Sequence, residues 1–249
     1  MHTYHGKRGT CAKPTPLKGE RDMQIANNIL KYGLKNVYFL TGTALAGKTS
    51  MAKALAKKHG FLWFDENYNG EPFKTWESIC DEKYQPLKIK RDKRHNKEET
   101  YDWDAHFERP VEEFIAEQSQ RGLNDEFMEF VMIELIKLSQ NNKVITDVCA
   151  PLELLVEISD YNRIACLLAS PHLVTTENYG SRDDHKSYLQ WIKSLDESEK
   201  KIAKQDEIFR IQTEKTFQEA KKYNIFNVVR TEASTIEGTL KLLEEHFKL

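Results

Sequence analysis

The residues of this sequence best suited to do chemistry lie together in one short stretch, residues 42–50. Its members are Gly42, Thr43, Ala44, Leu45, Ala46, Gly47, Lys48, Thr49 and Ser50. From Gly42 to Thr49 they match the pattern G-x-x-x-x-G-K-[ST] without a mismatch. The two glycines let the backbone wrap around an anion with its N–H groups pointing inward. Lys48 can then reach the β- and γ-phosphates, and the Thr49 hydroxyl can bind Mg²⁺.

The elements on either side of this stretch are those that such a loop requires. The run from Val37 to Leu40 is apolar, β-branched and aromatic, which predicts a buried strand. The run from Met51 to Lys58 consists of good helix formers and predicts a helix that begins near Gly47. The amino end of that helix adds roughly half a positive charge beside the loop. The context therefore predicts a binding site for a nucleoside triphosphate.

Two acidic residues follow short apolar runs that predict further strands. Asp65 comes directly after residues 61–64, and Asp147 ends residues 143–147. In a parallel sheet both would emerge at the carboxyl edge, where ligands bind. Asp147 is then placed to be the second ligand of Mg²⁺, beside Thr49. Asp65 has two interpretations, a ligand-binding group at this edge or a structural acid paired with a nearby cation.

The rest of the chain alternates helical and strand patterns. We expect a helix over residues 20–34, further strands over 162–168 and 225–229, and a long helix over 198–222. We also expect Ser234 to cap the last helix, with Glu237 completing a capping box. The pattern predicts an α/β fold with a five-stranded parallel sheet and right-handed connections. Residues 1–249 are expected to form a single domain, with 67–142 as a helical cap insertion and 170–200 as a lid.

Composition excludes several classes of protein. Of the 249 residues 39% are hydrophobic and 31% charged, with a formal net charge of −2, so no basic excess indicates nucleic acid. No apolar run approaches the roughly 18 residues of a membrane span, and the first residues lack the apolar core of a secretory signal. The four cysteines are widely spread, and we expect them to be reduced in a cytoplasmic protein.

At this point the chain resembles the P-loop small-molecule kinases, the nucleoside-, nucleotide- and shikimate-kinase-like group. The resemblance is carried by residues 42–49, by Asp65 and Asp147 after their strands, and by Arg182 in the segment after the fourth strand. It implies a three-layer α/β/α fold that uses ATP and Mg²⁺. It also implies that Arg182 is the lid arginine that reaches the transferring phosphate, although Arg163, Arg210 and Lys186 are rivals.

The resemblance further implies that the cap holds the phosphate acceptor. Asp65 would orient or deprotonate an acceptor hydroxyl, and Arg109 would bind the acceptor. Arg109 has an alternative as one half of a surface ion pair with Glu108 or Glu112. Lys48, Asp65 and Arg182 are thus the expected catalytic residues.

Other P-loop classes fit the sequence less well. A GTPase would show an [NT]-K-x-D signature, which this sequence lacks. Remodelling ATPases carry paired acids where this chain has Asp147-Val148. A kinase of polynucleotide ends would need a basic, aromatic-lined groove, for which residues 88–94 between Tyr84 and Tyr101 are a faint candidate. The block 88–100 otherwise predicts a solvated loop.

The leading hypothesis is an ATP- and Mg²⁺-dependent kinase of a small-molecule hydroxyl or phosphate. The alternative is a nucleotide-binding regulatory or switch protein that has no acceptor. The sequence names neither the acceptor nor the oligomeric state.

Overall fold

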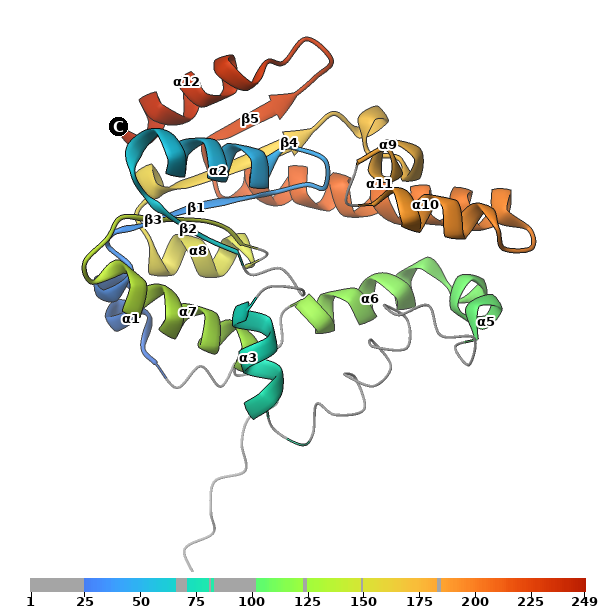
Figure 1. Cartoon of the computed structure of the whole chain (residues 1–249), viewed down its shortest axis with the longest axis horizontal. Helices are drawn as coiled ribbons and strands as arrows, with labels where there is room; N and C mark the ends of the chain where they lie inside the picture. Colours follow the sequence, from blue (N-terminus) through green and yellow to red (C-terminus); the bar gives the residue numbers. More distant parts are fainter. Residues whose placement is uncertain are drawn as a thin grey trace, which may run out of the picture.

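A computed structural model describes residues 25–65, 71–80, 82, 102–122, 125–148, 150–182 and 185–249. Its centre is a five-stranded sheet in which every paired strand is parallel, in the order β2-β3-β1-β4-β5 (Figure 1). The strands are β1 (Val37–Gly42), β2 (Leu62–Phe64), β3 (Val144–Asp147), β4 (Ile164–Ala169) and β5 (Asn227–Arg230). The predicted fold class, α/β with a five-stranded parallel sheet, is confirmed.

Strand β1 occupies the middle of the sheet, and this position decides where a ligand can bind. After β1 the chain goes to one side to form β2 and β3, and it then crosses to the other side for β4 and β5. The register pairs Leu40 of β1 with Asp147 of β3, and Gly42 of β1 with Leu167 of β4. The loop after β1 therefore lies where the strand order reverses, which is the usual ligand position in open parallel sheets.

One face of the sheet is covered by α2 (Lys48–His59) and α12 (Ile236–Phe247). Alternate residues of a strand point to opposite faces, so Tyr38 and Leu40 of β1 pack on this side. The helices contribute large apolar side chains to the same cluster, namely Met51, Leu55, Leu243 and Phe247. Burial of these side chains attaches α2 to the strand that precedes its loop.

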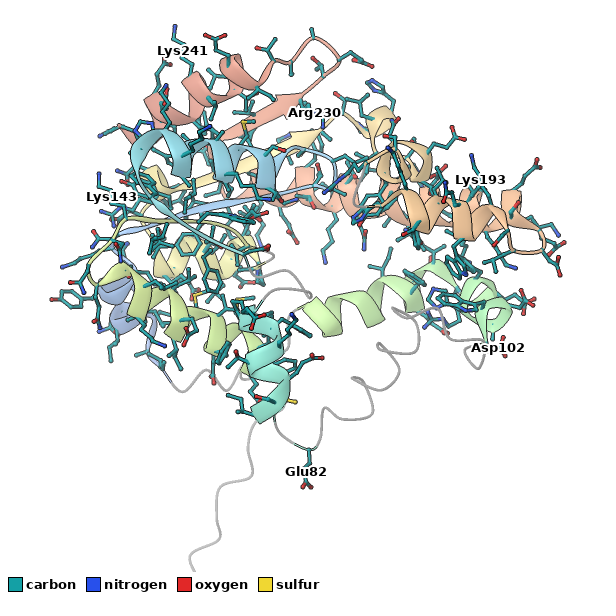
Figure 2. All side chains as sticks on the ribbon, in the orientation of Figure 1. Glu82, Asp102, Lys143, Lys193, Arg230 and Lys241 are labelled. Atoms are coloured by element: carbon teal, nitrogen blue, oxygen red, sulfur yellow. The ribbon has the colours of Figure 1, made fainter. Side chains whose placement is uncertain are left out.

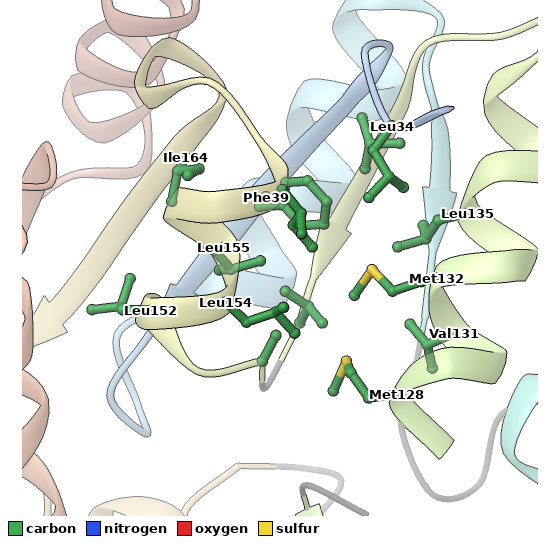
Figure 3. Close-up of a cluster of buried hydrophobic side chains, with 14 of the residues drawn as sticks. Leu34, Phe39, Met128, Val131, Met132, Leu135, Leu152, Leu154, Leu155 and Ile164 are labelled. Carbon is green, nitrogen blue, oxygen red and sulfur yellow. The ribbon is translucent and has the colours of Figure 1, made fainter. Parts of the chain in front are cut away.

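The opposite face is covered by α1 (Asn27–Gly33), α7 (Asp125–Ser139), α8 (Leu152–Ile158) and the last turns of α11 (Ser198–Lys222). Val37 and Phe39 of β1 pack on this side. Figure 3 shows Phe39 among the leucines of α8 and the methionines Met128 and Met132 of α7. Helix α3 (Glu71–Ile79) packs on α7 through Phe73 and Trp76. With helices on both faces, the sheet is the middle layer of three.

A second group of helices extends from the sheet at its carboxyl edge (Figure 1). After β4 come the 3₁₀ helix η3 (Pro171–Leu173), α9 (Thr176–Gly180) and α10 (Lys186–Lys193), and α5 (Trp103–Glu108) and α6 (Val111–Gly122) lie beside them. The rings of Trp103 and Trp191 meet edge to face, with centroids 4.2 Å apart. Val111 and Phe114 of α6 pack on Ile208 of α11. Helix α11 therefore connects this helical group to the sheet.

Several boundaries differ from the predicted ones. Strand β5 begins at Asn227, since Ile225 is buried in the core before pairing starts. The cap of α12 is Thr235, whose side chain accepts from the Gly238 N–H, so the predicted Ser234 cap is wrong. Within the stretch expected to form the cap, α7 packs against the sheet, whereas α5 and α6 pack on α10 and α11. The charged block 88–100 lies outside the described residues.

Candidate functional site

The loop between β1 and α2 can form only with glycine at its first position. Gly42 has φ +125°, and a Cβ placed there would lie 1.8 Å from the backbone oxygen of Leu167. That oxygen belongs to β4, which is paired to β1 and cannot move away. Gly47, the residue before α2, has φ +86°, again in the range that glycine adopts without strain. The backbone conformation of the loop thus explains why both positions of the motif are glycine.

The body of the loop is fastened to the neighbouring strands. The Thr43 N–H donates to the Leu167 carbonyl over 3.0 Å, and the Thr43 hydroxyl accepts from the Ala169 N–H over 2.7 Å. At the tip, Arg230 donates to the carbonyl of Leu45. Arg230 is the last residue of β5 and is labelled in Figure 2. The loop therefore has a defined shape that is set by β4 and β5.

Lys48 is the first residue of α2, and its side chain folds back over the loop. Its ammonium Nζ donates to the carbonyls of Thr43, at 2.6 Å, and Gly42, at 3.2 Å. The positive charge therefore lies against the loop at the amino end of α2, where the helix dipole has the same sign. Two sources of positive potential coincide, as binding of a polyphosphate requires.

Thr49 and Asp147 meet although nearly a hundred residues separate them in the chain. The Thr49 hydroxyl donates to Oδ2 of Asp147, and the indole N–H of Trp63 donates to Oδ1 over 3.1 Å. Asp147 is buried, with 8% of its surface exposed. Its position follows from the pairing of β3 with β1, which places Asp147 level with Leu40. The predicted pair of magnesium ligands is thus brought together.

The chemistry of this pair suits a hard divalent cation. Hydroxyl and carboxylate oxygens are the donors that Mg²⁺ accepts, and the ion usually takes one or two protein carboxylates while phosphates and water supply its other ligands. In the described ranges no three histidine, cysteine, aspartate or glutamate side chains cluster as a metal site. A cation held at Asp147 and Thr49 would therefore depend on the ligand's own oxygens.

Asp65 follows β2 directly and is half-buried. Because Phe64 is paired with Thr146 of β3, the chain reaches Asp65 at the level where β3 ends in Asp147. Asp65 therefore lies at the carboxyl edge of the sheet, on the side of β3 away from β1. This is the edge that carries the loop, and a role for Asp65 there stays a prediction.

Arg182, the predicted lid arginine, lies in the turn between α9 and α10. Arg182 is exposed, and its guanidinium lies 5.9 Å from the ring centroid of Tyr179. The segment starts from β4, next to β1, so it leaves the sheet at the same edge as the loop. Of the rivals, Arg163 precedes β4 at the opposite edge, and Arg210 forms an ion pair with Glu214 at 2.8 Å. Lys186 is the first residue of α10.

Arg109 is the residue that follows α5, and α5 lies at the end of the helical group away from the sheet (Figure 1). Its guanidinium contacts His106, with Nη2 3.2 Å from Nδ1, and lies 5.2 Å from the ring centroid of Phe114. Its carbonyl accepts from Lys204 of α11 over 2.5 Å. The structure thus places Arg109 in the contact between the cap helices and α11 and does not bring it to the loop.

Sequence reasoning missed two side chains that hold the site together. Trp63 binds Asp147, and Arg230 binds the loop at Leu45. The signal for Trp63 was its place in a strand next to β3, on the face shared with Ile145. The signal for Arg230 was a cation at the end of a strand, at the edge where anions bind.

Among the residues that the structure describes, the buried cysteine is Cys166 of β4. Burial raises its pKa to about 12, although the positive charge of Lys48 opposes the shift. The thiol is therefore neutral at ordinary pH and is a packing side chain rather than a nucleophile.

No model of a known protein family matches this chain, and no curated protein matches it significantly. None of the helices in the described part of the chain has the length and hydrophobicity needed to cross a bilayer.

Proposed function

We propose that this chain is a Mg²⁺-dependent phosphotransferase that moves the γ-phosphoryl group of ATP to a small-molecule acceptor. One observation carries the proposal. Lys48, Thr49 and Asp147 converge on a loop whose first glycine has no room for a side chain. Such an arrangement has a clear use in polyphosphate binding and little value as a packing device, because it places a lysine ammonium and a buried carboxylate close together at one edge of the sheet.

Binding of the triphosphate falls to the loop and to Lys48. The loop N–H groups and the amino end of α2 provide partial positive charge that needs no rearrangement. The Lys48 side chain already reaches back to the carbonyl of Thr43 at 2.6 Å, so it can exchange that acceptor for phosphate oxygens. Thr49 and Asp147 would hold Mg²⁺, which supplies charge neutralisation at the β- and γ-phosphates when it is bound.

The transfer step assigns a role to Asp65. An acceptor hydroxyl oxygen forms a bond to the γ-phosphorus, while the bond from that phosphorus to the β–γ bridging oxygen breaks. ADP leaves with the electron pair of the broken bond, and the hydroxyl proton passes to the Asp65 carboxylate. If the acceptor group is a phosphate already ionised, no proton moves and Asp65 only orients the acceptor. Arg182 of the lid would add positive charge at the transferring group.

The test is a metabolite-library screen in which ADP release is measured with ATP and Mg²⁺ present. The proposal expects one chemical class of acceptor to raise ADP release well above the rate without acceptor. A chain that binds ATP and Mg²⁺ tightly but releases ADP at the same rate with every compound would be a nucleotide-binding switch protein instead.

Asp65→Asn separates binding from transfer. The substitution removes the proton acceptor and keeps the size, so nucleotide affinity should stay within about twofold while acceptor-dependent ADP release falls roughly a hundredfold or more. The matched control is Asp160→Asn, an exposed acid paired with Lys31 at 2.9 Å and placed before β4. Parent-level transfer in Asp65→Asn would remove it from the mechanism, and loss of folding would make it a structural acid.

A further inference from the structure

Trp63 makes a polar contact that its packing does not require. Its indole N–H donates to Oδ1 of Asp147 over 3.1 Å, while Oδ2 of the same carboxylate accepts from Thr49. Each oxygen of Asp147 thus has its own donor, one from the edge strand β2 and one from the first turn of α2. A carboxylate bound in this way cannot rotate about its last bond without losing both contacts.

The sheet register explains how the indole reaches this carboxylate. Trp63 is level with Ile145 of β3, and both pack on the side of α2. Side chains in a strand lean along the strand direction, so a long ring can reach the next residue of β3 on the same face, which is Asp147. A smaller side chain at position 63 would not span this distance.

A lysine on α2 also contacts the indole, through the face of its ring. The Nζ atom of Lys53 lies 4.3 Å from the centroid of the Trp63 ring, within the range of a cation–π contact. The ring of this β2 residue is thereby also held by α2. The positive charge over the ring also strengthens the N–H as a donor to the buried carboxylate.

We infer that Trp63 is a positioning residue for the divalent cation that accompanies the nucleotide. Its indole N–H occupies one oxygen of Asp147, and the other oxygen is therefore turned to the Thr49 hydroxyl, where the cation would bind. Groups that orient a metal ligand in this way commonly change metal affinity by about ten- to a hundredfold when they are removed. This inference rests on the proposed function, because it assumes that Thr49 and Asp147 hold a cation.

The experiment uses the full chain, a fluorescent ATP analogue and Mg²⁺. Nucleotide binding is titrated against Mg²⁺ concentration, and nucleotide affinity is measured again in excess EDTA. Trp63→Phe keeps an aromatic ring and removes only the donor. It should raise the Mg²⁺ concentration for half-maximal binding about ten- to a hundredfold, and it should leave affinity in EDTA within about twofold.

The matched control is Trp103→Phe, the same exchange on α5 of the cap, which should show the parent's Mg²⁺ dependence. Parent-like Mg²⁺ dependence in Trp63→Phe would overturn the inference. An equal loss of affinity with and without Mg²⁺ would overturn it too, because that result describes a packing role.

Thr49→Ala distinguishes failure of this inference from failure of the proposed function. If Thr49→Ala raises the Mg²⁺ concentration for half-maximal nucleotide binding and Trp63→Phe does not, only the proposed role of Trp63 is contradicted. If neither substitution changes it, the cation site itself is contradicted.

A measurement on the parent chain covers the case in which Trp63→Phe does not fold. The four tryptophans give four indole N–H signals in a ¹⁵N spectrum, and Trp→Phe exchanges at the other three positions assign Trp63 by elimination. Adding Mg²⁺ to the nucleotide complex should shift the Trp63 signal. An unmoved Trp63 signal would contradict the inference.

Discussion

The two parts of the carboxyl edge of this sheet are built differently. Around β1 and β3, candidate functional side chains contact one another directly, as Thr49 does Asp147. In the lid and cap, the candidate cations instead lie on aromatic rings, Arg182 on Tyr179 and Arg109 on Phe114. The phosphate end therefore already has the geometry that its proposed chemistry needs, whereas the acceptor end would acquire it through movement of helices.

The difference follows from how each part is attached. The loop after β1 is fixed by hydrogen bonds to β4 and β5, which belong to the same sheet. The cap helices α5 and α6 contact α10 and α11, so their position depends on other helices and not on the sheet. A rigid phosphate end with a separately packed lid and cap is an arrangement typical of enzymes that close over their substrates.

Gly42→Ala should have the largest effect, because it attacks the fixed part. The new Cβ would lie 1.8 Å from the Leu167 oxygen at a φ of +125°, so backbone must shift. Overpacking and positive-φ strain together amount to about 3 kcal/mol, which corresponds to a fall in Tm of roughly 6–12 °C for a chain of this size. ATP affinity should fall by about a hundredfold or more, since the loop loses its shape.

The control for this variant is Gly60→Ala, at the end of α2. Gly60 also has positive φ, +69°, but its Cβ would meet nothing within 4 Å. Only the strain of about 1–2 kcal/mol remains, and ATP affinity should not change. Calorimetric melting and ATP titration of the two variants check both statements, and equal affinity in both would contradict a fixed loop.

Arg182→Ala tests whether the lid acts only after it closes. Arg182 is exposed and contacts Tyr179, so its removal should leave ATP affinity within about twofold. If it reaches the transferring phosphate on closure, kcat should fall about ten- to a hundredfold. Arg210→Ala, on the exposed pair with Glu214, is the matched control and should keep the parent's kcat. Parent-level kcat in Arg182→Ala would move the role to Lys186.

Lys201→Met should loosen the cap without touching the phosphate end. Lys201 is 7% exposed and donates to Asp104 of α5 and to the Asp196 carbonyl, both at 2.7 Å. Losing hydrogen bonds of a charged group costs about 2 kcal/mol, a fall in Tm of roughly 4–8 °C. Hydrogen exchange should accelerate in α5, while ATP affinity stays the same.

The neighbouring variant Lys200→Met provides the comparison for this measurement. Lys200 is an exposed residue paired with Glu197, and exposed pairs of this kind contribute little. Faster exchange in α5 for both variants would show that the contact between Lys201 and Asp104 is not specific.

Much of the fold could be predicted from the sequence because its signals are local. Buried strands were marked by short apolar runs, and helix 198–222 matches α11 at both ends. The prediction failed at Ser234, since the choice between two adjacent cap residues depends on which one faces the Gly238 N–H. The predicted start of β5 was wrong because Ile225 is buried in the hydrophobic core before the strand begins, so its apolar side chain does not mark the strand.

The site shows the same division between local and distant information. The spacing of positions 42–49 alone predicts the loop. Asp147 could be predicted because it ends the short apolar run 143–147. The placement of Arg109 depends on α6 packing against α11 through Phe114 and Ile208, nearly a hundred residues apart in the chain. An apolar stripe on a helix does not reveal its partner, so this contact could not be predicted from the sequence.

The most direct test of the central claim is a calorimetric titration of ATP with Mg²⁺ into the parent chain, Lys48→Ala and Lys57→Ala. Both lysines lie on α2, but Lys57 is exposed near its end and Lys48 lies over the loop. Lys57→Ala should bind ATP as the parent does. Lys48→Ala should keep its fold and bind roughly a hundredfold or more weakly, because the phosphates lose their charged partner. Equal affinity in Lys48→Ala and the parent would contradict the assignment of the loop after β1 as a triphosphate site.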